Sequence, residues 1–285
     1  MERGIINKEE IERIIAKTID IPSQSTIVFK VLNIFKNEFT SIEEIEALIS
    51  KDKGFTARFI RLANSPFYGF SRKIKSVREA LLLLGLDTAK SLILATSLRY
   101  LYRQFDTFEQ GLWEHSLAVG ICSSYLSEKI GEIKPQEALA CGVLHDIGVV
   151  FLKNAFPDKY QGIYEKIYES ERNLEEVEIE LLGYAHTDVG AYVAEKWNFP
   201  EEIKVAIQYH HIDNSFEETK ETFAHIHNLV RMSDLICMKL GMGFKKPINL
   251  ELENQNLLLH DSVNSEEFMK SLFSFFREER ALLLN

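Results

Sequence analysis

Seven residues have side chains that could hold a metal ion, and they lie in segments that are otherwise mostly apolar. They are five of the eight histidines and two aspartates: His115, His145, Asp146, His186, His210, His211 and Asp234. Imidazole and carboxylate are the ligands that borderline and hard divalent cations prefer. The set therefore predicts a divalent metal site, with iron, manganese or zinc as the candidate ions.

The surroundings of these residues predict that several of the side chains point inward. His145 and Asp146 follow the apolar segment 139–144, and neighbours on a helix point about 100° apart. They cannot share one flat face, but they can bracket an ion at a helix end if other helices supply further ligands. Asp234 lies in the apolar stretch 229–236, where an uncompensated carboxylate costs several kcal/mol. A cation, Arg231 or backbone amides could compensate it.

Each candidate also has an ordinary structural interpretation. His115 could be a hydrogen-bonded core histidine, and His145–Asp146 could be a capping or surface pair. His186 precedes two good N-cap residues, so it could merely flank a helix start. His210–His211 could end a helix, where the dipole favours imidazolium, and Asp234 could be an ion-pair partner. Each interpretation holds singly, but the order of all seven along successive helices is much harder to obtain by chance.

Helical periodicity runs through the chain and predicts the elements that position these residues. Ser41 and Ser76 each precede a glutamate by three residues and open an apolar helical pattern, as in a capping box. Asp87 can cap the next helix, Gly131 can end a helix, and Pro135 suits a first helical turn. Runs of alternating β-branched residues between tight turns are absent from the sequence. The fold class is therefore predicted to be all-α.

Motif content divides the predicted helices into three parts. Residues 1–105 form an N-terminal helical lobe, residues 106–245 a helical lobe with the histidine–aspartate cluster, and residues 246–285 a C-terminal helical tail. No Pro/Gly-rich linker marks these boundaries. The division therefore depends on where the candidate ligands lie.

Composition limits the classes of function. The chain has 285 residues, of which 46% are hydrophobic and 27% charged, so it has enough apolar material for a folded core. Its net charge of −10 repels a phosphate backbone and makes nucleic acid an unfavoured partner. The basic cluster 72–75 with Arg78 is short, and we interpret it as a solvated loop.

The sequence also predicts a cytoplasmic protein without membrane insertion. The N-terminus is polar, and no stretch approaches eighteen consecutive apolar residues. Cys122, Cys141 and Cys237 are far apart in apolar helical segments and form no CxxC pair. Buried, reduced thiols are the simplest interpretation.

The seven-residue order resembles the ligand layout of the HD superfamily of metal-dependent phosphohydrolases. More narrowly, the chain resembles the HDOD (HD-related output) domain over about residues 18–240. The matching segments are residues 50–52, 55–65, 68–69, 80–85, 112–116, 142–148, 185–191 and 197–200. The motif Leu62-Ala63-Asn64-Ser65, together with the helical lobe around it, distinguishes HDOD proteins from catalytic HD enzymes.

The resemblance implies an HD-type helical bundle with an additional N-terminal helical lobe, acting in bacterial signal transduction. It implies a protein signalling partner or a small phosphorylated or nucleotide ligand. We expect Arg58, Arg61, Asn64, Ser65 and Tyr68 mainly to build the first lobe, with a docking surface as the alternative.

Two departures from the related HD-GYP cyclic-dinucleotide phosphodiesterases bear on catalysis. Those enzymes have a lysine where this chain has Val149, and they have a Gly-Tyr-Pro element where it reads Ile-Asp-Asn-Ser-Phe over residues 212–216. The loss of a cation that contacts phosphate removes transition-state stabilisation. The sequence thus favours a non-catalytic regulator with no catalytic residues.

The alternative is a metal-dependent phosphohydrolase that acts on a phosphomonoester or phosphodiester. Four residues would then hold a first ion, and the remaining three would complete a second site. The first set is His115, His145, Asp146 and Asp234, and the second is His186, His210 and His211.

Overall fold

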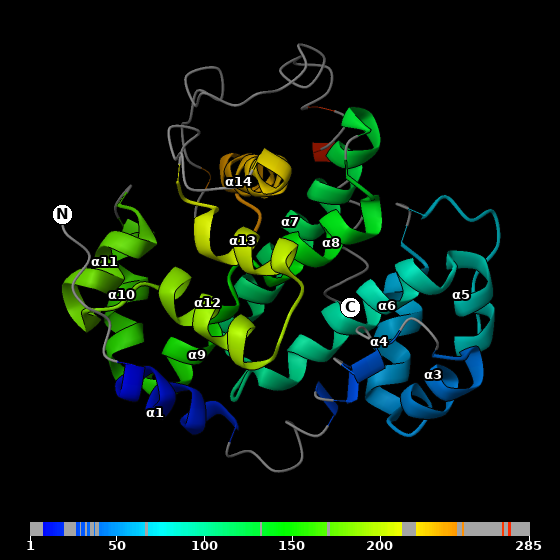
Figure 1. Ribbon diagram of the computed structural model, residues 1–285, viewed down its shortest axis with the longest axis horizontal. Coiled ribbons are helices and arrows are strands. Elements are labelled where there is room, and N and C mark those ends of the chain that lie inside the picture. Colours follow the sequence, from blue (N-terminus) through cyan, green and yellow to red (C-terminus); the bar gives the residue numbers. More distant parts are fainter. Residues whose placement is uncertain are drawn as a thin grey trace. The chain divides into compact units, whose positions relative to one another are not determined.

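The computed structural model describes residues 8–19, 27–28, 30–31, 33–34, 37, 40–65, 68–131, 133–169, 172–212 and 221–243, with positions 247, 270 and 273–274. Every regular element in these ranges is a helix, which confirms the all-α prediction (Figure 1). The chain divides into two compact units: a larger one of residues 1–25 and 101–258, and a smaller one of residues 26–100 and 259–285. The predicted C-terminal tail, 246–285, lies almost wholly outside the described residues.

Four helices of the smaller unit are described over their whole length: α3 (Ile42–Ile49), α4 (Lys53–Ala63), α5 (Val77–Leu84) and α6 (Leu86–Leu98). The capping box of Ser41 is present at the start of α3, and the Ser76 hydroxyl accepts from the backbone of Glu79 at the start of α5. The prediction that Asp87 caps the next helix is wrong. Gly85, with φ of 76°, both ends α5 and begins α6, so Asp87 lies inside the first turn.

Asn64 ties the end of α4 to the segment before α5. Its Nδ2 donates to the carbonyl oxygens of Ile60 and Ile74 at 2.8 and 2.9 Å. Its Oδ1 accepts from the backbone N–H of Ile74 at 2.7 Å. Both polar ends of the amide are thus used within the unit, which gives Asn64 a structural role.

A second polar group, formed by Asp52, Arg58 and Tyr100, links the start of α4 to the residues that follow α6. Asp52 caps α4, because its Oδ1 accepts from the backbone of Phe55 at 2.8 Å. Its Oδ2 accepts from the Tyr100 hydroxyl at 2.6 Å, and Arg58 donates to the same hydroxyl at 2.8 Å. The Tyr100 hydrogen bond lowers the pKa of Asp52, against the opposing effect of its partial burial. Burial and the Asp52 carboxylate raise the pKa of Tyr100 to about 12.

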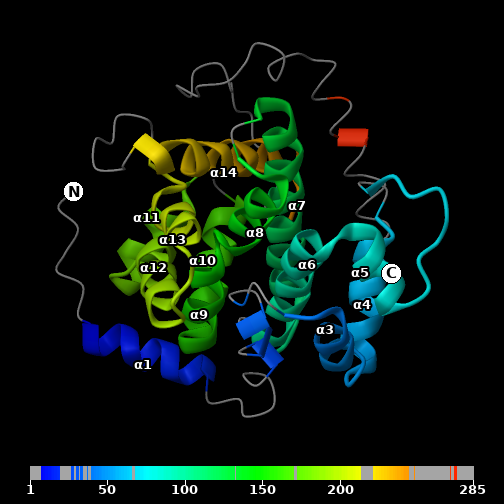
Figure 2. The ribbon, with the colours of Figure 1, turned by 45° about the vertical axis from the view of Figure 1, so that its right-hand side comes forward.

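The described helices of the larger unit are α1 (Lys8–Ile19), α7 (Thr107–Ile130), α8 (Pro135–Leu144), α9 (Ile147–Ala155), α10 (Pro157–Glu169), α11 (Leu174–Leu182), α12 (His186–Lys196), α13 (Glu201–Tyr209) and α14 (Glu221–Lys239). The short 3₁₀ turn Arg99–Leu101 lies between α6 and α7. Gly131 ends α7 with φ of 79°, and Pro135 opens α8, as predicted. Helix α14 packs against α7, α8 and α13 (Figure 2).

Helix α1 belongs to the larger unit, whereas the division from sequence grouped it with the helices of residues 42–98. Its apolar face buries Ile11, Ile14 and Ile15, and the helix packs against α9 and α12. Glu12 accepts hydrogen bonds from Tyr192 and Lys196 of α12 at 2.7 and 3.0 Å.

Two pairs of glycines let helices of the larger unit approach closely. A Cβ on Gly142 of α8 would lie 2.7 Å from the Cα of Gly120 in α7. A Cβ on Gly148 of α9 would lie 1.9 Å from the carbonyl oxygen of His186 and 2.8 Å from the backbone nitrogen of Gly190 in α12. These contacts bring together the helices that carry the candidate ligands.

One stretch among the described residues, Pro135–Ala155, is long and apolar enough to cross a membrane. It consists of α8, the junction His145–Asp146 and α9, and its apolar 18-residue segment is buried inside the structure, whereas Glu137 near its start is exposed. The apolar character of this stretch is therefore explained by its position in the core of the larger unit.

Candidate metal centre

The seven predicted residues all lie in the larger unit, and the structure brings them together. His115 lies within α7, and His145–Asp146 form the junction between α8 and α9. His186 begins α12, His210–His211 follow the end of α13, and Asp234 lies within α14. Five separate parts of the fold thus supply the cluster.

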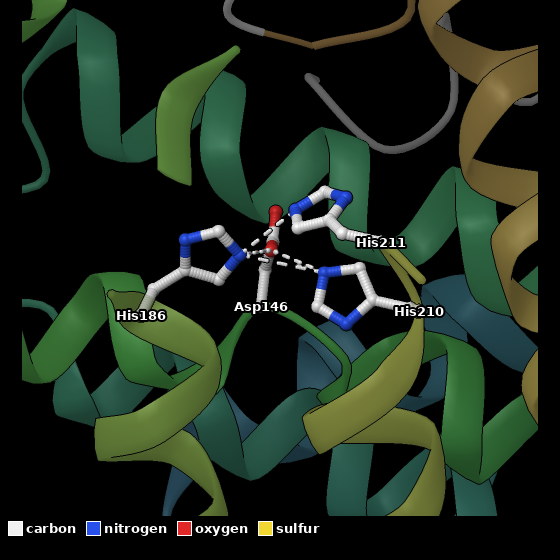
Figure 3. A group of neighbouring side chains, drawn as sticks. All are labelled: Asp146, His186, His210 and His211. Atoms are coloured by element: carbon white, nitrogen blue, oxygen red, sulfur yellow. Dashed lines mark hydrogen bonds and ion pairs between the residues drawn. The ribbon is translucent and has the colours of Figure 1, made fainter. Parts of the chain in front are cut away.

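The first group of ligand atoms is formed by Asp146, His186, His210 and His211, whose side chains face one another in Figure 3. The Oδ1 atom of Asp146 lies 3.4 Å from His186 Nε2 and 3.5 Å from His210 Nε2. His186 Nε2 lies 3.4 Å from His210 Nε2 and 3.1 Å from His211 Nε2. Ligands about 2.1 Å from one ion lie about 3.0 Å apart in an octahedron and about 3.4 Å apart in a tetrahedron. The spacing of this group matches both.

The second group is formed by His115, His145 and Asp234. His115 Nε2 lies 2.9 Å from Asp234 Oδ1. Asp146 also faces this group, because its Oδ2 lies 3.3 Å from His145 Nε2 and 3.9 Å from His115 Nε2. The sequence interpretation placed Asp146 in one ion site only. In the structure each of its two oxygens faces a different group.

The other ring nitrogen of four of these histidines faces a hydrogen-bond acceptor. Nδ1 of His115 lies 3.0 Å from the Met242 carbonyl oxygen, and Nδ1 of His145 lies 2.7 Å from the Gly142 carbonyl oxygen. Nδ1 of His210 lies 2.9 Å from the Ile207 carbonyl oxygen. Nδ1 of His186 lies 2.6 Å from Glu178 Oε2. A proton on Nδ1 satisfies each of these contacts, because carbonyl and carboxylate oxygens only accept hydrogen bonds. Such a partner directs the Nε2 lone pair into the cluster, as in most metal-binding histidines.

With every ring neutral and protonated on Nδ1, which is the metal-binding form, the cluster contains more acceptors than donors. When Nδ1 carries the only ring proton, the Nε2 atoms of His186 and His210 direct lone pairs at each other and at Asp146. His145 Nε2 is buried and has no hydrogen-bond partner among the described residues. Buried polar atoms without partners are costly, and a cation at the centre of each group would satisfy them. The residues present thus fit divalent metal ions.

The charges of the cluster suit the same role. Burial alone would raise the pKa of Asp146 and of Asp234, but the neighbouring histidines hold both values below the ordinary one. Burial lowers the pKa of His210 and of His211. Burial alone would also lower the pKa of His186, but the Glu178 carboxylate outweighs it and raises that pKa to about 9. The carboxylates stay charged, and His210 and His211 stay neutral, which are their metal-binding forms. Against the lowering effect of burial, neighbouring carboxylates raise the pKa of His145 as well as that of His186, so these two rings must release a proton when an ion binds.

Six of the seven side chains are buried. The exposed fractions are 0% for His186 and His210, 1% for His145, 3% for Asp234, and 4% for His115 and Asp146. His211 is half-buried. Val149, at the position of the lysine of the HD-GYP enzymes, is fully buried within α9. The cluster is an internal centre rather than an open cleft.

Sequence reasoning missed Glu178, Tyr160 and the carbonyl group of Met242. Glu178 lies on the buried side of α11, but other glutamates in this helix conceal it in the sequence. Tyr160 donates a hydrogen bond to Glu178 from α10. The amino-acid sequence does not indicate which backbone carbonyl group, such as that of Met242, will face a functional side chain. Gly243, with φ of 113°, is close to His115, and a Cβ there would lie 2.5 Å from the Cβ of His115.

A family model described as the HDOD domain matches residues 21–212. The chain is 25% identical over 222 residues to an uncharacterized protein of Treponema pallidum, a match that covers 75% of this chain and 43% of that protein. It is 27% identical over 205 residues to ribonuclease Y of Mycoplasma genitalium, covering 69% of this chain and 32% of that protein. The chain thus spans less than half the length of these two curated relatives.

Three solved structures are similar to the chain. An HDOD domain protein of unknown function from Geobacter sulfurreducens is 26% identical, with a TM-score of 0.65 over 91% of this chain and 86% of that one. A candidate phosphohydrolase of Shewanella amazonensis is 22% identical, with a TM-score of 0.71 over 94% and 97%. A candidate signal transduction protein of Marinobacter aquaeolei is 18% identical, with a TM-score of 0.69 over 100% and 63%. The last two structures are less than 25% identical to the chain, so they show a shared fold alone.

Proposed function

The chain belongs to the HDOD domain family, and we propose that it is a signalling module whose histidine–aspartate cluster holds divalent metal as a structural and regulatory centre. In this proposal the chain acts through a protein partner, or through a small phosphorylated or nucleotide ligand, rather than by turnover of a substrate. A cytoplasmic location and a bacterial origin stay predictions.

The observation that carries the proposal is the excess of acceptors inside the cluster. The His186 and His210 Nε2 atoms lie 3.4 Å apart, and Asp146 Oδ1 lies at a similar distance from both. If the rings are uncharged and carry their protons on Nδ1, none of these three atoms can donate a hydrogen bond to the other two. A bound cation would supply the positive charge that these atoms need, in place of the second proton that the pKa of about 9 gives His186, so the arrangement supports a cation site.

The burial of the cluster supports regulation over turnover. Only His211 among the seven side chains is more than slightly exposed, so a phosphoester would need the helices around the cluster to move before it could reach an ion. The apolar side chain of Val149 also supplies no charge to a substrate phosphate. An ion would instead hold together the helices that meet at the cluster, since binding to the folded state alone stabilises that state.

The second candidate is the metal-dependent phosphohydrolase. It is favoured by the position of Asp146, because a carboxylate with one oxygen toward each group suits two neighbouring ions. Bound ions of this kind lower the pKa of water and polarise a phosphate. The curated relative named ribonuclease Y adds an RNA phosphodiester to the substrates that are worth testing.

Metal analysis of the full chain, purified without chelator, tests the proposal together with a phosphoester panel. We expect bound iron, manganese or zinc and no turnover of phosphomonoesters, cyclic dinucleotides or RNA. Asp146→Ala should lose the metal. Asp106→Ala is the matched control, because Asp106 caps α7 and pairs with Lys153 outside the cluster. It should keep the metal.

Two results would change the proposal. Robust turnover of a phosphodiester that vanishes with Asp146→Ala, but not with Asp106→Ala, would establish the enzyme instead. A wild-type chain that binds none of these metals, even when they are added in excess, would remove the metal centre from either proposal.

A further inference from the structure

Glu178 is a fully buried carboxylate outside the predicted ligand set. It lies in α11, and its exposed fraction is 0%. A charged carboxylate in a protein interior is costly unless several donors surround it. The position of Glu178 therefore requires an explanation beyond packing.

Three donors surround Glu178, and two of them belong to one residue. Its Oε2 accepts from the backbone N–H of His186 at 2.8 Å and from His186 Nδ1 at 2.6 Å. Its Oε1 accepts from the hydroxyl of Tyr160, which is itself 1% exposed. One carboxylate thus fixes both the backbone and the ring of His186, while Tyr160 fixes the carboxylate.

The two contacts with His186 have different consequences. The backbone contact satisfies a free N–H at the start of α12, where Ala185 offers no capping side chain. The ring contact holds a proton on Nδ1, so that Nε2, which lies 3.4 Å from Asp146 Oδ1, is the ring nitrogen left to bind a cation. A carboxylate in this position also makes the imidazole a stronger donor to a cation.

We infer that Glu178, held by Tyr160, is the positioning residue that makes His186 a metal ligand. This inference rests on the proposed metal centre. It predicts that the Glu178 contact sets the affinity of the group formed by Asp146, His186, His210 and His211, although Glu178 touches no ion itself.

A helix cap alone is the competing explanation, and the fold separates the two. Thr187 Oγ1 already donates to Glu175 Oε1 of α11 at 2.9 Å, so the start of α12 stays linked to α11 without Glu178. A glutamine at position 178 can still accept from His186 through its amide oxygen, and its amide group can donate to Tyr160. Glu178→Gln therefore removes the charge while keeping the shape and the cap.

The test measures Mn²⁺ affinity by calorimetry on the full chain after chelator treatment, for wild type, Glu178→Gln and Tyr160→Phe. Glu109→Gln is the matched control, because Glu109 is also buried, at 1% exposed, but pairs with Lys153 and accepts from the backbone N–H of Gln104, just before α7. Loss of such an outer partner typically costs about 10–100-fold in metal affinity. We expect a loss in that range for Glu178→Gln, a smaller loss for Tyr160→Phe, and none for Glu109→Gln.

Two further readouts separate positioning from stability. The visible absorption bands of the Co²⁺-loaded chain should shift in Glu178→Gln but not in Glu109→Gln, since they report the ligands around the ion. The melting temperatures of the metal-free Glu178→Gln and Glu109→Gln chains measure the stability that each lost charge costs without metal, so that an effect on metal affinity can be compared between variants of known stability.

Each outcome decides between the explanations. Equal Mn²⁺ affinity and equal Co²⁺ spectra in wild type and Glu178→Gln would overturn the inference while leaving the metal centre in place. A loss of affinity of the same size in Glu109→Gln would overturn it too, because the effect would then be one of general stability. A wild-type chain that binds neither ion would overturn the proposed metal centre and this inference together.

Discussion

The histidine cluster of the larger unit and the Asn64 junction of the smaller unit are both polar groups that join helices, but their hydrogen bonding differs. Asn64 has its amide donors on two carbonyl groups and its amide oxygen on one N–H. In the cluster, the Nε2 atoms of His186, His210 and His211 face one another across distances of 3.1 to 3.4 Å. The amide of Asn64 has both donor and acceptor partners, whereas the histidine nitrogens need a proton or a cation between them.

This difference separates a structural polar group from a binding site. A buried polar group that only holds helices together is stable when every donor finds an acceptor. A group that leaves acceptors facing one another is stable only when a proton or a cation joins it. The cluster should therefore respond to metal, while the Asn64 junction should respond only to changes in its own partners.

The largest effect is expected from Gly148→Ala, which tests whether close helix contact assembles the cluster. The new Cβ would lie 1.9 Å from the carbonyl oxygen of His186, so α9 and α12 could not keep their present contact. We expect a loss of more than about 4 kcal/mol in the free energy of unfolding, the range of severe core substitutions. Chemical denaturation and metal content would both report it.

Gly162→Ala is the control for this substitution. Gly162 lies in α10, and a Cβ there would meet nothing within 4 Å. Alanine in a helix is more favourable than glycine by about 1 kcal/mol, so this variant should be slightly more stable than wild type. A Gly148→Ala chain that folds and binds metal as well as Gly162→Ala would contradict the role given to the α9–α12 contact.

Addition of metal should stabilise the chain through the cluster alone. Mn²⁺ at a hundred times its dissociation constant should stabilise the folded state by about 2.7 kcal/mol, provided that the unfolded chain does not bind it. The melting temperature would show this shift for wild type and for Asn64→Ala, but not for Asp146→Ala. A shift of equal size in Asp146→Ala would mean that Mn²⁺ binds elsewhere.

Asn64→Ala should destabilise the smaller unit without changing metal content. The substitution leaves the N–H and C=O of Ile74 without their Asn64 partner, whereas the Ile60 carbonyl still accepts from the backbone N–H of residue 64. Each buried orphan costs about 1–3 kcal/mol. Urea denaturation would measure the loss. If stability were unchanged and binding to a partner protein were lost, Asn64 would belong to a docking surface instead.

The same contrast explains how much could be predicted from the sequence. The candidate ligands were identified because histidine and aspartate in apolar helices are unusual, and the helices followed from periodicity and from caps such as that of Ser41. Glu178 was missed, because a glutamate in a glutamate-rich helix is ordinary until the fold places His186 beside it. The two-sided position of Asp146 likewise depends on how α9 meets α12, which the close contact of Gly148 allows.

The smallest effect is expected from Asp52→Asn, which tests the acid sensitivity of the smaller unit. The Tyr100 hydrogen bond, together with the Phe55 backbone N–H, lowers the pKa of Asp52, while its partial burial opposes them. A carboxylate whose folded pKa is lowered contributes stability above its unfolded pKa of about 3.9 and loses it as the pH falls through the folded value.

Asparagine keeps an acceptor for the cap of α4 but does not titrate. Stability measured in urea from pH 7 to pH 3, with chelator present, should therefore fall less steeply for Asp52→Asn than for wild type. The cluster carboxylates titrate in both chains and cancel in the difference, which stays below one proton. Identical slopes would mean that Asp52 is equally acidic in the folded and unfolded chain, and that its contact with Tyr100 contributes nothing to the acid response.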